Sequence, residues 1–178
     1  VSAHTTERPN KKRNGKFLLV GVSSTKTEYV PTASSYTVDG YTYDLAEITY
    51  KACESNSTLK TVDLSRLSHL KDINKSAFKY CTALSTVKLN SSSTPLAIRD
   101  EAFAYCTSLT TFNVTNNVDD LAPTAVAGCS NLTTITVGSL NTRFCDVNGM
   151  LYSKDKTVLK RCPPGYRTTI FNHSAFPS

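Results

Sequence analysis

The sequence has few charged residues and no long apolar segment. Asp, Glu, Lys and Arg together make up 19% of the 178 residues. Solubility therefore has to depend largely on hydroxyl and amide groups, which the abundant Ser and Thr residues help to supply. No stretch approaches the about 18 apolar residues that span a bilayer, and Val1 does not begin a signal peptide. These absences predict a mature or excised chain without membrane insertion.

Patterns for metal binding and catalysis are also missing. The six cysteines include no C-x-x-C pair, and the three histidines, His4, His69 and His173, lie far apart in the sequence. A zinc site needs clustered Cys and His ligands, and a cysteine nucleophile needs an oriented base beside it. We therefore expect no metal, no cofactor and no enzymatic activity.

Positive charge is concentrated at the start of the chain. The net charge is +6, and much of it lies in residues 8–16, RPNKKRNGK. Because runs of like charge are usually solvated, we interpret residues 1–16 as a basic, flexible lead-in. An arm that binds nucleic acid or another anionic surface is the less favoured alternative. Residues 17–178 are predicted to form a single domain without a nucleic-acid partner.

An internal repeat organises the rest of the sequence. Residues 98–114, IRDEAFAYCTSLTTFNV, align without gaps with residues 48–64, 73–89 and 121–137. Successive copies begin 25, 25 and 23 residues apart. Self-similarity at a fixed period of roughly 20 to 50 residues marks a solenoid, in which each unit buries its apolar face against its neighbours. We therefore predict four stacked repeats over residues 48–137.

The second half of each repeat has the pattern of a β-strand. It reads Leu, two polar residues, an apolar residue, a polar residue and an apolar residue, as in the strand segment of leucine-rich repeats. Alternation turns the apolar side chains into the core, so the intervening residues face outward. We predict these outward residues as the ligand-binding face: Thr61, Asp63, Thr86, Lys88, Thr111, Asn113, Thr134 and Thr136.

The first half of each repeat has the spacing of a short helix. In the second copy, apolar or small residues stand at Ile73, Ala77, Phe78, Cys81 and Leu84, which are 4, 1, 3 and 3 residues apart. This spacing fits about two helical turns. The predicted fold class is therefore an α/β repeat solenoid of the leucine-rich-repeat type, with one strand and one short helix in each repeat.

Other elements are expected on both sides of the repeats. Residues 17–47 are predicted to form N-terminal strands and a hairpin that turns at Asp39-Gly40. Residues 144–165 read as an inserted antiparallel β-meander. Residues 169–178 resemble the start of a further, partial repeat.

The cysteines fall into two groups. Cys81, Cys106 and Cys129 occupy one repeat position. Because a free Cys behaves as a small buried hydrophobe, we predict a ladder of thiols in the core. Cys145 and Cys162 lie off the repeat, within the predicted meander. They are candidates for a disulfide if the protein is extracellular.

Three features together resemble the BspA-like leucine-rich-repeat proteins. They are the unit Ile-x-x-x-Ala-Phe-x-x-Cys-x-x-Leu-x-x-Val-x-Leu, the segment NGMLYSKDK at 148–156 that runs on to CPPG at 162–165, and VDGYTY at 38–43. That family contains surface and secreted proteins of bacteria and of some anaerobic protozoan parasites. The resemblance covers about residues 36–176 and implies a strand–helix solenoid used for adhesion or host contact without catalysis.

The repeat and the resemblance lead to one functional expectation. We expect a non-catalytic binding module, secreted or on the cell surface, that recognises an extracellular or host protein or glycan through a concave strand face. The alternative is a structural spacer that projects another domain from the cell surface and has no ligand of its own.

Overall fold

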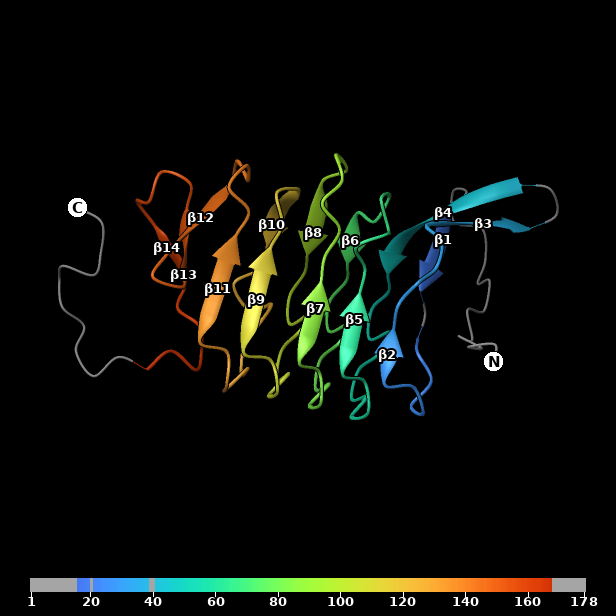
Figure 1. The fold of residues 1–178 in the computed structure, drawn as a ribbon, viewed down its shortest axis with the longest axis horizontal. Helices are drawn as coiled ribbons and strands as arrows, with labels where there is room; N and C mark the ends of the chain where they lie inside the picture. The colour runs from blue at the N-terminus through green and yellow to red at the C-terminus, as the bar shows by residue number, and fades with distance from the viewer. Residues whose placement is uncertain (1–15, 20, 39–40, 168–178) are drawn as a thin grey trace.

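The chain forms a stack of coils with strands on two opposite sides. The computed structural model describes residues 16–19, 21–38 and 41–167. The coils follow one another from the N-terminal to the C-terminal end, and one row of strands lies in front of the other (Figure 1). The predicted lead-in and the predicted partial repeat at 169–178 lie almost entirely outside the described residues. The fold is a leucine-rich-repeat β-solenoid of about 5 turns.

The front row contains the strands that the repeat pattern predicts. All of them run parallel to their neighbours, because each is reached by a full turn of the coil. One sheet holds β2 (Glu28–Tyr29), β5 (Thr61–Asp63) and β7 (Thr86–Lys88), and a second holds β9 (Thr111–Val114) and β11 (Thr134–Val137).

The back row is a six-stranded sheet that the repeat pattern did not predict. Its main path runs β1, β4, β6, β8, β10, and β3 pairs with β4. The strands are β1 (Lys16–Leu19), β3 (Ser35–Val38), β4 (Tyr41–Ile48), β6 (Asp72–Ile73), β8 (Leu96–Ile98) and β10 (Val118–Leu121). Each repeat therefore begins in a back strand and ends in a front strand.

The predicted helices are wrong, because the described residues contain no helix. The segment between a back strand and the next front strand is a series of tight turns. The amide of Ala77 donates to the carbonyl of Asn74 at 3.1 Å, and the amide of Cys81 donates to that of Phe78 at 3.2 Å. The intervening amide of Phe78 donates instead to the carbonyl of Ala102 in the next coil, at 2.7 Å. A helix would keep all these bonds within one coil.

Left-handed residues hold the turns in this path. Ser76 and Tyr80 have φ angles of 57° and 61°, and Glu101 and Tyr105 in the next coil have angles of 56° and 60°. An α-helix needs φ near −63°, so such a residue interrupts it. The apolar residues still recur every three or four positions, because each tight turn also brings the chain back to the core after that interval.

The core lies between the two rows and repeats with the coils. Phe78 stacks on Phe103 with ring centroids 5.1 Å apart and an interplanar angle of 5°. Leu59, Leu84 and Leu109 are completely buried one above another at the same repeat position. Each coil thus buries its apolar residues against the coils on either side, as the alignment predicted.

The predicted hairpin and meander are both present. In the hairpin, β3 pairs antiparallel with β4 through Tyr36 and Tyr43, while its turn at residues 39–40 lies outside the described residues. The meander consists of β12 (Phe144–Val147), β13 (Met150–Ser153) and β14 (Leu159–Arg161), in that order. Positive φ angles of 52° at Asn148 and 79° at Gly149 form the tight turn between β12 and β13.

Candidate binding surface

The eight predicted surface residues form aligned pairs along the front row. Thr61 pairs with Thr86, and Asp63 with Lys88. In the second front sheet the pairs are Thr111 with Thr134 and Asn113 with Thr136. All eight are exposed or half-buried, which confirms that they face outward. Neighbouring strands place such pairs about 4.8 Å apart.

The row has two halves, which lie in separate sheets and carry different side chains. We call Thr61, Asp63, Thr86 and Lys88 the charged half, and Thr111, Asn113, Thr134 and Thr136 the amide half. In the charged half, Lys88 Nζ lies 3.2 Å from Asp63 Oδ2. The pKa of Asp63 is lowered, first by the hydroxyl of Ser65 and then by its backbone amide and by Lys88. Most of the charge in this half is therefore already paired.

The amide half keeps unused hydrogen-bonding groups. The hydroxyl of Thr136 donates to Asn113 Oδ1 at 3.3 Å. Among the described residues, the Nδ2 of Asn113 and the hydroxyls of Thr111 and Thr134 have no hydrogen-bond partner. Thr111 and Asn113 are both exposed. These groups can donate to or accept from a ligand without breaking a bond within the protein.

The missing helices also affect the shape expected of this surface. Helices pack about 8–10 Å apart, whereas strands lie about 4.8 Å apart. A stack with helices on one side is wider on that side and curves around its strands. Here both sides of the coil carry strands (Figure 1). The physical reason for a strongly concave strand face is therefore absent.

The thiol ladder lies in the core, as predicted. Cys81, Cys106 and Cys129 are completely buried, and their Sγ atoms contact the carbonyl oxygens of Cys53, Phe78 and Phe103 at 3.0, 3.2 and 3.1 Å. Burial raises the pKa of Cys81 to about 12 and that of Cys129 to about 11. Thiols in this state are poor nucleophiles and poor metal ligands. The described residues contain no group of three or more His, Cys, Asp or Glu that could hold a metal ion.

The two cysteines of the meander are free thiols on separate strands. Cys145 lies in β12, Cys162 follows β14, and β13 lies between these strands. Two strand spacings amount to roughly 9.6 Å, whereas the Cα atoms of a disulfide are usually about 4.4–6.8 Å apart. The predicted disulfide would therefore require the meander to rearrange.

An open groove lies between β10 and the meander, away from the front row. Its volume is about 540 Å³, and its lining includes Asp119, Asp120, Arg143, Lys154 and Lys160. Charges of both signs line it. Part of the negative charge is already paired, because Asp120 Oδ2 lies 2.8 Å from Nη1 of Arg99, which directly follows β8. The groove therefore does not favour a ligand of one charge.

A stacked pair of tyrosines on the turn segments is the surface feature whose geometry the sequence did not indicate. Tyr80 and Tyr105 have ring centroids 4.7 Å apart and an interplanar angle of 17°. They remain 43% and 40% exposed. Lys79 Nζ lies 5.3 Å from the Tyr80 centroid and 5.9 Å from that of Tyr105. Both tyrosines lie in the first halves of repeats, where the sequence predicted short helices.

The backbone under this pair is strained. Both tyrosines are left-handed, which costs an L-residue with a Cβ roughly 1–2 kcal/mol. An aromatic pair contributes about 0.5–1.5 kcal/mol beyond its buried area, and an exposed cation–π contact about 0.5–1 kcal/mol. The stabilisation from the contacts of the pair therefore does not clearly offset the conformational cost of two left-handed residues. Gly128 takes the equivalent position in the next coil with φ of 70° and no such cost.

The part of the chain that the structure describes has no helix long and apolar enough to cross a membrane.

The architecture and its surface row define the class: a repeat protein of the leucine-rich type that offers an extended face rather than a deep pocket. The family model of the BspA type leucine rich repeat region matches residues 42–147 in 6 copies. The chain belongs to this family. The family is typically non-catalytic. A comparison with curated proteins gives no match.

Two solved structures share the fold. A leucine-rich repeat protein from Bacteroides capillosus is 24% identical with a TM-score of 0.59, and the match covers 72% of this chain and 91% of that one. The pneumococcal vaccine antigen PcpA is 20% identical with a TM-score of 0.58, and the match covers 85% of this chain and 50% of that one. At these identities the likeness shows the fold alone.

Proposed function

We propose that the chain is a non-catalytic binding module, secreted or displayed on a cell surface, that contacts an extracellular or host protein or glycan through its front row of strands. The observation that carries the proposal is the row of eight outward residues, aligned in register within each of the two parallel front sheets. Solenoid proteins commonly bind through such extended faces. The membership in a family of surface-type proteins, with a vaccine antigen among the structural neighbours, supports the location.

Within the row, the amide half is the expected centre of contact. A ligand gains most from polar groups that have no partner in the free protein, because no internal bond is lost on binding. Asn113 and Thr111 meet this condition, whereas Lys88 and Asp63 already pair with each other. The charged half would then set the approach and orientation of the ligand rather than most of its affinity.

The proposal is tested by replacing the outward side chains without touching the core. In one variant, Thr86, Thr111 and Asn113 become Arg and Lys88 becomes Glu. The labelled native chain is first applied to a glycan array and to immobilised extracellular-matrix proteins, and the strongest partner is then titrated against the variant. We expect binding at least 10-fold weaker, because bulky charges would block close approach to the sheet.

A matched control carries exposed charge changes on other parts of the coil. Lys71→Glu and Asp119→Lys change exposed residues before β6 and in β10 and should leave binding unchanged. Equal unfolding midpoints would show that all variants fold. Unchanged binding by the front-row variant would exclude this face as the binding site. A native chain that binds neither the glycan array nor the immobilised matrix proteins would favour the structural spacer.

A further inference from the structure

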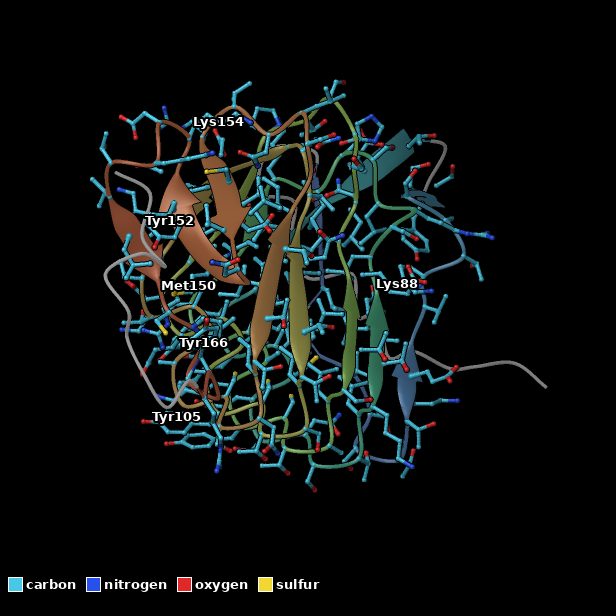
Figure 2. The ribbon with its side chains drawn as sticks, turned by 60° about the vertical axis from the view of Figure 1, so that its left-hand side comes forward. Lys88, Tyr105, Met150, Tyr152, Lys154 and Tyr166 are labelled. Carbon is cyan, nitrogen blue, oxygen red and sulfur yellow. The ribbon has the colours of Figure 1, made fainter. Side chains whose placement is uncertain are left out.

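The tyrosine stack lies on a different surface from the front row. Tyr80 and Tyr105 belong to the turn segments that connect back strands to front strands. Figure 2 shows Tyr105 at the lower edge of the stack of coils, well apart from Lys88 at the end of its front strand. Whatever contacts the tyrosines therefore need not contact the strand row.

The stack is closed at one end and lacks a further ring at the other. A Cβ built on Gly128 would come within 2.4 Å of the Tyr105 ring, so the Gly128 backbone lies directly against that ring. Tyr80 covers the other face of Tyr105. At the Tyr80 end, the equivalent position in the preceding coil is Ser55, whose amide donates to the carbonyl of Lys79 at 2.7 Å. A serine is too small to continue the stack, so Tyr80 is its terminal ring.

The charges around the stack are paired with each other. Lys79 Nζ lies 2.8 Å from Glu101 Oε1, and Lys51 Nζ lies 3.0 Å from Glu54 Oε2. The neighbourhood therefore offers an aromatic surface and polar groups with little local net charge. A strongly charged ligand would gain little here, because Lys79 and Lys51 each already have a carboxylate beside them.

The size of the patch also limits its ligand. A stable protein interface usually buries at least about 1,000 Å², and a patch of two half-exposed rings cannot supply the core of one. It does match a single flat ring that has an apolar face and a polar rim. Aromatic faces bind such surfaces by stacking, and the phenol hydroxyl adds a hydrogen-bonding group.

We propose that Tyr80 and Tyr105 form a carbohydrate-binding subsite, in which a neutral sugar ring stacks on the terminal Tyr80 ring while its hydroxyls contact the phenol oxygens and the Lys79–Glu101 pair. Tyr105 supports Tyr80 from behind. A single subsite of this size binds weakly, so several chains on one surface would be needed for stable attachment to a glycan. This site is independent of the front-row proposal.

The test uses the position of Gly128 as a guide to a variant that folds. Because glycine fits the same backbone position in the next coil, Tyr80→Gly with Tyr105→Gly removes both rings and also relieves their left-handed strain. Neutral hexose and N-acetylhexosamine oligosaccharides are titrated into the native chain and the variant. Tyrosine fluorescence and ring NMR signals report binding, and the chain has no Trp to mask them. We expect millimolar binding by the native chain and at least a 10-fold loss in the variant.

Two controls separate stacking from other effects. Tyr80→Phe keeps the ring and should retain binding within about 3-fold, since the stacked face is preserved. Tyr50→Ser removes a tyrosine that is 60% exposed and stacks on no other ring within the described part of the chain, and it should leave binding unchanged. Absence of sugar binding by the native chain would overturn the proposal, as would equal binding by the glycine variant. If the glycine variant lost binding to an immobilised protein but not to the sugars, the stack would be a protein contact, and the proposal would be overturned too.

Discussion

Cysteine side chains are buried to different extents in the coil stack and in the C-terminal meander. In the stack, Cys81, Cys106 and Cys129 are completely buried, and each contacts a carbonyl of the coil before it. In the meander, Cys145 and Cys162 are only half-buried. Cys81 and Cys106 lie between two neighbouring coils, and Cys129 lies between a coil and the meander. Within the described part of the chain, the meander has a coil on one side only. Cover on both sides, whether by coils or by a coil and the meander, therefore decides the chemistry of a cysteine here.

The difference predicts strongly unequal thiol reactivity, which is the largest effect expected. In the native protein near neutral pH, a maleimide should label Cys145 and Cys162 more than 10³-fold faster than Cys106, because a fully buried thiol reacts only after the structure opens. Mass spectrometry of digested samples taken over time would measure the rates. All six cysteines should react once the chain is unfolded in guanidinium chloride.

Two outcomes would change this comparison. Rapid labelling of Cys106 in the native chain would mean that the coils open easily. Failure of both Cys145 and Cys162 to react until a reductant is added would mean that the meander does rearrange to form the predicted disulfide.

The second prediction concerns a buried hydroxyl group in the meander. Tyr152 is 3% exposed, and its hydroxyl is buried without a hydrogen-bond partner among the described residues. An unsatisfied buried polar group costs about 1–3 kcal/mol, so Tyr152→Phe should raise the free energy of unfolding by about 1 kcal/mol. Urea unfolding with an unchanged m-value would measure it.

A control separates the hydroxyl from the ring of Tyr152. Tyr152→Ala should lower the free energy of unfolding by about 3–5 kcal/mol, as large aromatic truncations in cores do. If Tyr152→Phe is instead less stable than the native chain, the hydroxyl has a hydrogen-bond partner that stabilises the protein. The buried polar groups of the meander would then be hydrogen-bonded as completely as those of the coils.

Much of the fold follows from residues that recur in the sequence. The front strands were predictable because Leu, Val and Phe alternate with polar residues at one place in every repeat. The turn between β12 and β13 was predictable because Asn148 and Gly149 both accept positive φ. The helices were predicted wrongly, because apolar spacing of three and four residues fits a chain of tight turns as well as a helix. The signals that distinguish the two, such as the bond from Phe78 to Ala102, join coils 24 residues apart and leave no local pattern.

The candidate surface could be predicted only in part for the same reason. Alternation alone placed Thr111 and Asn113 outward, and the structure confirms it. Their role in binding stays a prediction. The pairing of Asp63 with Lys88 and the stacking of Tyr80 on Tyr105 depend on which coils are neighbours in register. The left-handed backbone at the tyrosines was signalled only indirectly, by Gly128 at the aligned position of the fourth repeat, because Gly usually marks such positions.

The smallest expected effect concerns the two halves of the front row. A double-mutant cycle with Asp63→Asn and Lys88→Met should give a coupling of about 0.2–1 kcal/mol at pH 7, since Lys88 is exposed. The pKa of Asp63 is lowered in the folded state. Its stabilisation is therefore fully present above the unfolded value of about 3.9 and is lost as the pH falls through the lower folded value.

The coupling should accordingly shrink when the cycle is repeated in acid, below the lowered folded pKa of Asp63. The matched cycle in the amide half, Asn113→Ala with Thr136→Ala, contains no titrating group and should give the same coupling at both pH values. A pH-independent coupling between Asp63 and Lys88 would show that their charges do not interact. Both halves of the row would then offer unpaired polar groups, and the proposal that ligand contact centres on the amide half would lose its basis.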